Sequence, residues 1–288
     1  MGEIDEVVRR LTGSEVADVR ELGGGDAGAA RSVLLADGRR VFVKANPPEL
    51  PGAVAAEAAS LAWLAEPGVV PVPEVLGSTE RYLITEHLEP GRPDAAAAEE
   101  LGRGLARLHD AGAPAHGSPP PGGPADAWIG LAPMRDEPAA DWPSFYAEHR
   151  VLPYLRGAAD RGLLDAEESA LVERVCGRLS ELPGAGAPPA RLHGDLWAGN
   201  VHWSGGAGWL IDPAAHGGHP ETDLAMLALF GCPHLDRLRA AYREVRPLAP
   251  GWEDRIGVHQ LFPLLVHAVL FGGGYARQAV AAARAAPL

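Results

Sequence analysis

Side chains that could carry out acid–base and metal chemistry are concentrated in one short stretch, from Leu192 to Asp212. The stretch contains His193, Asp195 and Asn200 and ends on the second aspartate. A carboxylate beside a hydroxyl group can orient it and accept its proton, and this is the role that we predict for Asp195. Amide and carboxylate oxygens are ligands that Mg²⁺ prefers, so Asn200 and Asp212 are the predicted metal ligands.

The spacing of these residues is that of a kinase catalytic loop. His-x-Asp is followed by Asn200, five residues after the aspartate, and strands predicted at 200–203 and 208–212 lead to Asp212. The alternative is a set of ordinary turn residues, because Asp and Asn are common in turns. The complete pattern favours phosphoryl transfer over that alternative. For His193 we predict a structural role, in which it braces the loop by hydrogen bonding.

Lysine and asparagine are rare in this chain. Of the 25 basic side chains, 24 are arginines and only Lys44 is a lysine, while Asn46 and Asn200 are the only asparagines. Such a bias suggests that chemistry requires these residues where they remain. A lysine kept among arginines favours a role as a compact point charge rather than as a planar fork.

The sequence around Lys44 predicts a nucleotide site. Lys44 ends the β-rich run Val-Phe-Val-Lys, and Glu57 follows thirteen residues later on a helix predicted at 53–65. A strand lysine paired with a helix glutamate would place its charge on the phosphates of ATP. The alternative for Glu57 is a solvent-facing helix charge, but the position of Lys44 favours the pair.

Two further segments are predicted to contact ATP. The glycine-rich run at 23–28 includes Gly24 and Gly25, whose backbone N–H groups could approach phosphates, although a simple turn is the alternative. Glu86, His87 and Leu88 follow a strand predicted at 82–85 and are expected to meet the adenine, because they lie between the two parts of the chain.

The pattern of elements predicts an α+β protein with two lobes. β-rich runs at 31–36 and 40–44 flank Asp37-Gly38, a hairpin signal, and precede the predicted helix and strand. We predict a small β-rich nucleotide-binding lobe over 1–88 and a larger, mainly helical catalytic and substrate-binding lobe over 89–288. The expected helices of the second lobe are 95–110, 142–156, 165–182, 221–230, 234–245 and about 253–285, and a Pro/Gly-rich surface loop is expected at 113–124.

Composition excludes several classes of protein. The formal net charge of −13 disfavours nucleic acid and anionic membranes as partners, because such binding depends on basic patches. Cys176 and Cys232 lie far apart without CxxC spacing, which argues against a disulfide framework. No apolar run is long enough for a membrane span, and the acidic start does not resemble a secretory signal. A cytoplasmic location is expected, whereas the oligomeric state is not predicted.

Several motifs together resemble the fructosamine kinase, or ketosamine-3-kinase, family. They are His-Gly-Asp-Leu-Trp-Ala-Gly-Asn-Val at 193–201, Ile-Asp-Pro-Ala at 211–214 and Gly-His-Pro-Glu-Thr-Asp-Leu-Ala-Met at 218–226. Phe-Val-Lys at 42–44, Trp-Ile-Gly at 128–130 and Trp-x-x-Phe at 142–145 are similar to further landmarks, so the resemblance spans nearly the whole chain. Trp197, between the aspartate and the asparagine, is its most specific part.

The resemblance implies a protein-kinase-like fold, related to that of aminoglycoside phosphotransferases, and phosphorylation of ketosamines with ATP and Mg²⁺. In that family the 3-hydroxyl of the sugar is phosphorylated and the unstable adduct then leaves, which repairs the glycated amine. Asp195 would be the proton acceptor, and residues 86–88 would contact adenine. Many relatives carry a redox-sensitive cysteine in the nucleotide-covering loop; residues 23–30 contain none, so that switch is not expected.

The segment after Asp212 contains further polar residues. Trp197 and His216 could line a sugar pocket, with a purely structural role as the alternative. His216 and His219 could also be metal ligands, but the spacing lacks a third ligand. Glu221 or Asp223 is expected to cap the helix that follows.

Other functions remain as alternatives at this point. Within the enzymes, a kinase of aminoglycosides, choline or homoserine would use the same motifs. A nucleotide-binding pseudokinase is disfavoured, because Lys44, Asp195, Asn200 and Asp212 are all intact. A metal-dependent hydrolase would need a compact three-ligand motif that the sequence does not show.

Overall fold

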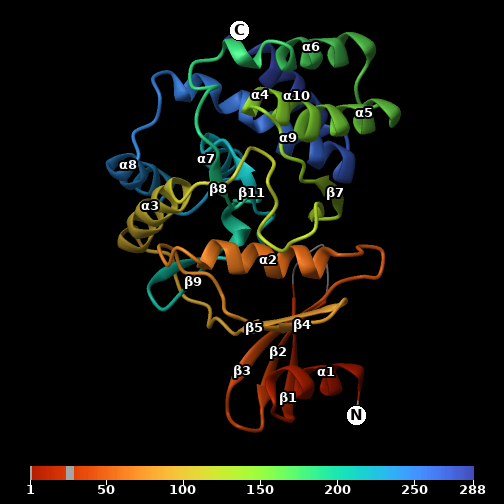
Figure 1. Cartoon of the computed structure of the whole chain (residues 1–288), viewed down its shortest axis with the longest axis vertical. Coiled ribbons are helices and arrows are strands. Elements are labelled where there is room, and N and C mark those ends of the chain that lie inside the picture. The colour runs from red at the N-terminus through yellow and green to blue at the C-terminus, as the bar shows by residue number, and fades with distance from the viewer. Residues whose placement is uncertain (1, 24–28) are drawn as a thin grey trace.

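An antiparallel sheet forms the N-terminal part of the protein. The computed structural model describes residues 2–23 and 29–288, and its sheet has the strand order β1-β2-β3-β5-β4. Helix α1 (Glu3–Thr12) packs on one side of the sheet, and α2 (Ala53–Ala65) lies between the sheet and the rest of the chain (Figure 1). The strands are β1 (Val16–Leu22), β2 (Ala29–Leu35), β3 (Arg40–Ala45), β4 (Val75–Ser78) and β5 (Tyr82–Glu86).

The predicted hairpin is confirmed as β2 and β3. Gly38, in its turn, has a φ of 88°, which an L side chain rarely adopts. Along β3 the residues alternate between the two faces of the sheet. Val41 and Val43 are buried in a cluster with α1, whereas Lys44 and its neighbours two residues away on either side line a cavity on the opposite face.

The chain leaves the sheet after Glu86 and enters the helical part at α3 (Ala95–Asp110). Asp94 begins this helix by accepting a hydrogen bond from the N–H of Ala97 at 2.8 Å. The predicted division at 88/89 falls in the connecting segment. Helix α3 packs along α8 (Leu235–Val245), and both helices were predicted from the sequence. Their buried face continues into a core that includes Trp63 of α2.

A second helical core is built around α9 (Trp252–Phe271). It packs against α10 (Gly274–Arg284), α5 (Leu152–Asp160) and α7 (Glu221–Phe230). The single helix predicted at 253–285 is therefore two helices, separated by Gly272 and Gly273. Pro263 inside α9 cannot donate a backbone hydrogen bond, and the Tyr146 hydroxyl donates to the freed carbonyl of His259 at 2.8 Å. The predicted helix at 142–156 comprises α4 (Trp142–Phe145), a π-helical turn at 146–151 and α5, and 165–182 forms α6 (Ala166–Cys176) and a 3-10 turn.

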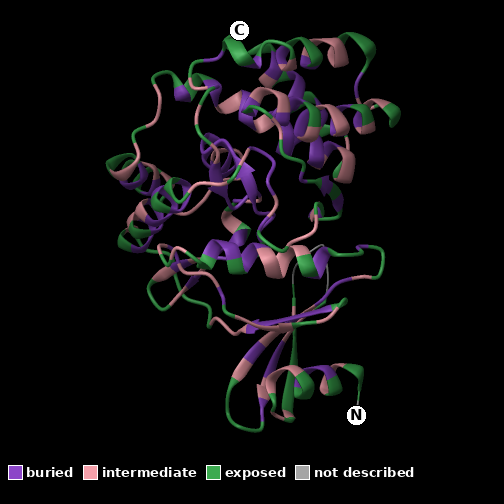
Figure 2. Cartoon of the chain, viewed as in Figure 1, coloured by how far each residue is buried: buried purple, intermediate pink, exposed green. Residues whose placement is uncertain are grey.

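The non-helical island of the larger part consists of two strand pairs. β8 (Ala190–Leu192) pairs with β11 (His216–Gly218), and β9 (Val201–Ser204) pairs with β10 (Ala207–Leu210). A hairpin that was not predicted, β6 (Asp126–Ile129) with β7 (Ala132–Arg135), lies beside α2. Buried residues concentrate around α7, β8 and β11, while the outer faces of α3, α6 and α8 are exposed (Figure 2).

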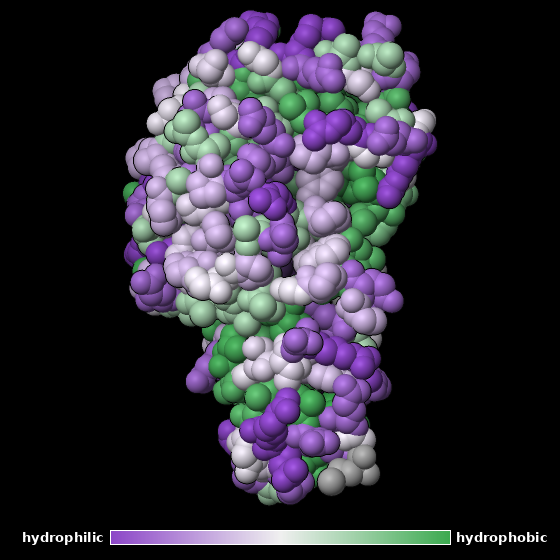
Figure 3. All heavy atoms as spheres, turned by 45° about the vertical axis from the view of Figure 1, so that its right-hand side comes forward, coloured by the Kyte–Doolittle hydropathy of each residue, from purple (hydrophilic) through white to green (hydrophobic). Residues whose placement is uncertain are grey.

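Helix α2 is attached to the helical part by polar contacts. Arg191 donates to the Trp63 carbonyl at 2.7 Å and to the Glu66 carboxylate at 2.6 Å, and Ser60 Oγ accepts from the N–H of Ala215 at 3.3 Å. The whole molecule has a narrow N-terminal part and a broad C-terminal part (Figure 3). Among the described residues, no helix combines the length and apolar character needed to cross a bilayer.

Candidate active site

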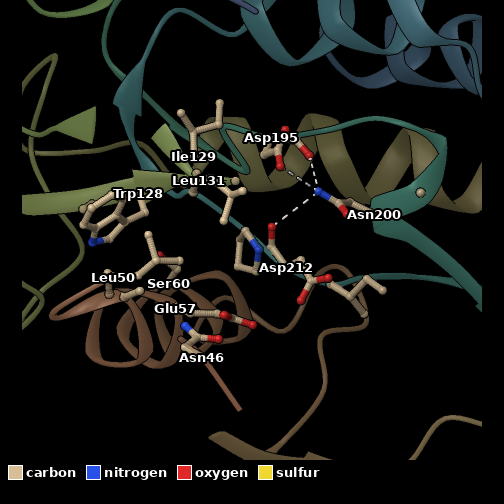
Figure 4. Close-up of a pocket in the computed structure, with 18 of the residues that line it drawn as sticks. Asn46, Leu50, Glu57, Ser60, Trp128, Ile129, Leu131, Asp195, Asn200 and Asp212 are labelled. Carbon is tan, nitrogen blue, oxygen red and sulfur yellow. Dashed lines mark hydrogen bonds between the residues drawn. The ribbon is translucent and has the colours of Figure 1, made fainter. Parts of the chain in front are cut away.

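A cavity of about 870 Å³ lies between the sheet and the helical part. Its walls come from strand β3, helix α2, the β6–β7 hairpin, the loop before β9, the segment after β10 and the ends of α7, α9 and α10. Glu57 and Asn46 face it from the N-terminal side, and Asp195, Asn200 and Asp212 from the other (Figure 4). The cavity therefore brings together the predicted catalytic and metal-binding residues.

Lys44 joins the two sides of the cavity. Its Nζ lies 2.9 and 3.0 Å from the carboxylate oxygens of Glu57, as predicted for the pair, and 2.9 Å from Oδ1 of Asp212. Burial alone would lower the pKa of Lys44. The two carboxylates raise it by more than burial lowers it, so the pKa lies above its ordinary value. Burial would raise the pKa of Asp212, and the Lys44 ammonium outweighs this and holds it below its usual range.

Asp212 has an unusual backbone conformation. Its φ of 49° lies in the left-handed region, which is uncommon for a residue other than glycine. The residue follows β10, and the carbonyl of Asn200 accepts a hydrogen bond from the adjacent Ile211 N–H at 3.1 Å. Such strain persists only where the surroundings enforce it, and here it accompanies a carboxylate that faces Lys44 across the cavity.

Asp195 and Asn200 are held against each other. The Asn200 amide nitrogen donates to the Asp195 backbone carbonyl at 2.7 Å and to its Oδ2 at 3.0 Å, and it lies 3.4 Å from the Asp212 carbonyl. These three acceptors orient the amide, and its oxygen makes no hydrogen bond to the described residues. Burial is the main cause that raises the pKa of Asp195 to about 7, although the hydrogen bond from Asn200 opposes the shift.

The loop that carries Asp195 is braced from below by Asp223. This buried carboxylate accepts hydrogen bonds from the N–H groups of His193 at 2.8 Å and Gly194 at 3.0 Å. The expectation that Glu221 or Asp223 caps α7 is wrong, because neither makes a capping bond to that helix. Gly194 is required by geometry: its φ is 82°, and an added Cβ would lie 2.0 Å from the Ala214 carbonyl oxygen.

The structural role predicted for His193 agrees with its contacts. Its imidazole is fully buried, with Nε2 at 3.0 Å from the Ile211 carbonyl oxygen and Nδ1 accepting from the N–H of Asp195 at 3.3 Å. The Nε2 therefore carries the proton, since a carbonyl can only accept. Burial lowers the pKa of His193, which keeps the ring neutral as this pattern requires. The histidine thus ties the start of the loop to the strand that leads to Asp212.

The two predicted substrate residues lie in different environments. Trp197 is 40% exposed and lines the cavity, and its contact with a sugar stays a prediction. His216 is 2% exposed, does not line the cavity, and places Nδ1 2.9 Å from the carbonyl oxygen of Ala214. Burial lowers its pKa to about 3. The structure thus favours the structural alternative for His216, because its ring is enclosed behind the cavity wall.

The structure does not place the other predicted nucleotide-binding residues, those outside β3 and α2, on the cavity wall. Gly24 and Gly25 lie outside the described residues, although the adjacent Gly23 lines the cavity. Glu86, His87 and Leu88 leave β5 at the connection between the two parts and are not on the wall of this cavity. Their contact with adenine stays a prediction.

Two polar residues of the cavity wall were not assigned a role from the sequence. Asn46 is 6% exposed and its Oδ1 has no partner among the described residues. The rarity of asparagine was the signal in the sequence. Asn46 directly follows β3, two residues beyond Lys44, and faces the same cavity. Asp136 is 1% exposed, pairs with Arg150 through Oδ1 and leaves Oδ2 without a partner among the described residues. Burial raises its pKa to about 6, although Arg150 opposes the shift. No sequence motif marked it.

Most ligand atoms in a second group of potential metal ligands are engaged in hydrogen bonds. His219, Glu221 and His259 place ligand atoms within 4.8 Å of one another. Arg255 occupies both oxygens of Glu221 at 2.5 and 3.0 Å, and the two ring nitrogens of His219 bind the Glu221 N–H and the Gly184 carbonyl. In this buried His–Glu–Arg cluster (His219, Glu221, Arg255, His259), Nε2 of His259 has no hydrogen-bond partner among the described residues and lies 3.4 Å from the Glu221 carboxylate. Both oxygens of that carboxylate are bound by Arg255, which argues against a metal-dependent hydrolase.

The oxygens in the cavity fit a hard divalent cation. Asn200 Oδ1 and Asp212 Oδ2 make no hydrogen bond to the described residues, so both can accept a ligand bond. A carboxylate and an amide oxygen suit Mg²⁺ and leave room for water and phosphate oxygens in its shell.

The chain matches the family model for fructosamine kinase over residues 1–285. It is 35% identical over 265 residues to a probable ketoamine kinase of Klebsiella aerogenes, covering 91% of this chain and 90% of the relative. It is also 32% identical over 281 residues to a chloroplastic protein-ribulosamine 3-kinase of rice, covering 93% and 78%.

Solved structures give the same result for the fold. A candidate fructosamine-3-kinase from Thermobifida fusca superposes with a TM-score of 0.92 at 50% identity, covering 99% of this chain and 98% of the other. A mutant aminoglycoside phosphotransferase solved with ADP and hygromycin B has a TM-score of 0.66 at 16% identity and full coverage of both chains, a likeness of fold alone. The protein has a protein-kinase-like α+β fold and is a phosphotransferase, and it belongs to the fructosamine kinase family.

Proposed function

We propose that the protein transfers the γ-phosphoryl group of ATP to a sugar hydroxyl of ketosamines such as fructosamines or ribulosamines, in particular to the 3-hydroxyl. The observation that carries the proposal is the meeting of Lys44 with Glu57 and Asp212 in the same cavity as Asp195 and Asn200. The names of the relatives supply the acceptor class. Residues 1–88 would hold the nucleotide and residues 89–288 the acceptor.

Lys44 would bind the phosphates as a positive charge that the protein has already placed. Glu57 holds the ammonium on one side while Asp212 contacts it on the other. A fixed cation costs little reorganisation when charge develops on the transferring group. Residues 86–88, and Gly24 and Gly25, would contribute backbone contacts to adenine and phosphates.

Asp195 would act on the acceptor. Its carboxylate orients the hydroxyl and takes its proton while the oxygen attacks the γ-phosphorus and the bond to the bridging oxygen of ADP breaks. The raised pKa of Asp195, about 7, suits a group that must accept a proton near neutral pH. Asn200 keeps this carboxylate in place through its amide N–H.

Asn200 and Asp212 would hold Mg²⁺ through oxygens that make no hydrogen bond to the part of the chain that the structure describes. When bound, the ion neutralises charge on the β- and γ-phosphates. Asp212 would then exchange part of its contact with Lys44 for the cation, and Lys44 would turn towards the phosphates. Trp197 would lie beside the acceptor at the cavity wall.

The proposal is tested by a substrate screen. ATP consumption is measured with ribulosamines, fructosamines, erythrulosamines, aminoglycosides and choline, and the product is located by phosphorus NMR. We expect turnover with one or more ketosamines, phosphate on the 3-oxygen, and loss of both with EDTA. Turnover confined to aminoglycosides or choline would contradict the proposal.

A further inference from the structure

The large hydrophobic side chains that the protein exposes are concentrated at the mouth of the cavity. Among the described residues, Val19, Leu131, Trp197 and Phe271 are more than a third exposed, at 37%, 39%, 40% and 54%. All except Val19 line the cavity that contains Asp195. Exposed apolar surface that is gathered at a cavity indicates a binding site rather than chance exposure.

Two of these side chains, Trp197 and Phe271, belong to a continuous aromatic surface, and Leu131 lines the same cavity. Trp197 lies edge-on to Phe230 at 6.3 Å between ring centroids, and Phe230 lies 4.6 Å from His267. His267 in turn lies 5.5 Å from Phe271 and 5.1 Å from Tyr275. The catalytic loop, α7, α9 and α10 therefore meet through their rings. We call the set Leu131, Trp197, Phe230, Phe271 and Tyr275 the collar.

The collar carries no basic charge. The ring of His267 donates from Nδ1 to the Pro263 carbonyl at 2.8 Å, and burial lowers its pKa, so it is a neutral ring at neutral pH. Lys44 is the only Lys or Arg among the described residues on the cavity wall, and it is already paired with two carboxylates. Further inside, the wall carries Asp136 and Asp195. An acceptor with a cationic nitrogen and an uncharged, flat substituent matches this distribution.

We propose that the collar binds the substituent on the amine nitrogen of the acceptor and selects apolar, above all aromatic, amines. This inference rests on the proposed function, in which the sugar hydroxyl lies at Asp195. The amine end of the same molecule then extends towards the mouth of the cavity, where its substituent covers the exposed rings. A carboxylate-bearing amine, as in an amino acid adduct, gains nothing there, because Lys44 is the one Lys or Arg on the described part of the wall and is already paired.

The test compares fructose adducts of three amines: ethylamine, benzylamine and glycine. All three keep the same sugar and a secondary amine. We expect kcat/KM to be about tenfold or more higher for the benzylamine adduct than for the ethylamine adduct, because the ring buries additional apolar area. The glycine adduct is expected to be the weakest acceptor. The difference should lie in KM, with kcat nearly equal for benzylamine and ethylamine.

The variant Phe271→Ala tests whether the collar affects binding of the amine substituent without affecting phosphoryl transfer. This side chain is more than half exposed, so the variant is expected to fold, which thermal unfolding checks. We expect KM for the benzylamine adduct to rise about five- to tenfold and KM for the ethylamine adduct to rise by less, because the ethyl group covers less of the collar. Leu131→Ala should act in the same direction. Val19→Ala is the matched control, since it removes an exposed apolar side chain of β1 that does not line the cavity.

Three outcomes would overturn the inference. Equal kcat/KM for the ethylamine and benzylamine adducts would show that the collar does not read the amine substituent. If Phe271→Ala lowered kcat/KM equally for both adducts, the residue would act on the sugar or on folding rather than on the amine substituent. A dimer that Phe271→Ala dissociates would make the collar a subunit contact. Absence of turnover with any ketosamine would instead contradict the proposed function itself.

Discussion

The cavity and the buried His–Glu–Arg cluster contain similar types of residue, but their surroundings shift the pKa values of the carboxylates Asp195 and Glu221 in opposite directions. In the cavity, Asp195 has a pKa raised to about 7, and oxygens of Asn200 and Asp212 have no hydrogen-bond partner among the described residues. In the cluster, burial would raise the pKa of Glu221, but His259 and Arg255 outweigh it and lower the pKa to about 2. The cavity differs from the cluster because its carboxylate and amide oxygens line an open space, whereas both oxygens of Glu221 are bound by Arg255.

The largest effect is expected from removing the carboxylate of the cavity. Asp195→Ala should lower turnover by roughly 10²–10⁴-fold, because the acceptor loses its general base. ATP binding should persist, since Lys44 and Glu57 are untouched. Steady-state kinetics and nucleotide titration measure the two quantities. Near-normal turnover would show that Asp195 is not the general base.

The reverse pattern is expected in the cluster. Glu221→Gln should lower the free energy of unfolding by about 3–5 kcal/mol, because it leaves the buried guanidinium of Arg255 without its counter-charge. Turnover per folded molecule should change little. Glu181→Gln is the matched control, because it breaks an Arg–Glu pair that is solvent-exposed. Chemical denaturation compares the variants; equal stability of both would show that the cluster is not a structural ion pair.

Lys44→Arg tests whether the cavity requires a point charge. The variant keeps the positive charge, but a planar guanidinium cannot occupy the same position between Glu57 and Asp212. We expect kcat/KM for ATP to fall about 10–100-fold, as for a misplaced positioning group. Unchanged kinetics would mean that the lone lysine reflects composition only.

The pH dependence gives the smallest and most specific effect. For the free enzyme, kcat/KM should fall about tenfold per unit below pH 7, as Asp195 becomes protonated. Its folded pKa is raised above the unfolded value, so its contribution to stability is fully present at low pH and is lost as the pH rises through 7. Asp195→Asn should therefore stabilise the protein by on the order of 1–3 kcal/mol at pH 8 and by less at pH 5. Thermal unfolding at the two pH values tests this, and an equal gain at both would contradict the raised pKa.

Local signals made much of the fold predictable. The hairpin around Gly38, the helix 53–65 and the helix 95–110 are found where the sequence placed them, because turn residues and capping groups act over a few positions. The β6–β7 hairpin was missed, since its strands are only four residues long and contain Pro133. Gly130, with a φ of 56°, marks its two-residue turn. The break between α9 and α10 was also missed, although Gly272 and Gly273 mark it.

The site was predictable where its residues lie close in sequence or follow a known spacing. Lys44 pairs with Glu57 as expected, and Asn200 contacts Asp195. Contacts that join distant segments were not predictable. The cluster links Glu221 to Arg255 across 34 positions, and the collar joins the catalytic loop to α10. Only tertiary packing decides such meetings.

The attachment of α2 has a mechanical consequence. Because Arg191 and the Ala215 N–H fasten this helix to the segment that surrounds the catalytic loop, Glu57 and Asp212 belong to one rigid frame. Lys44, on β3, belongs to the sheet. A displacement of β3 relative to both carboxylates would lengthen the two contacts of the lysine together. The distances from the Lys44 ammonium to Glu57 and Asp212 therefore depend on how the sheet lies relative to the catalytic loop.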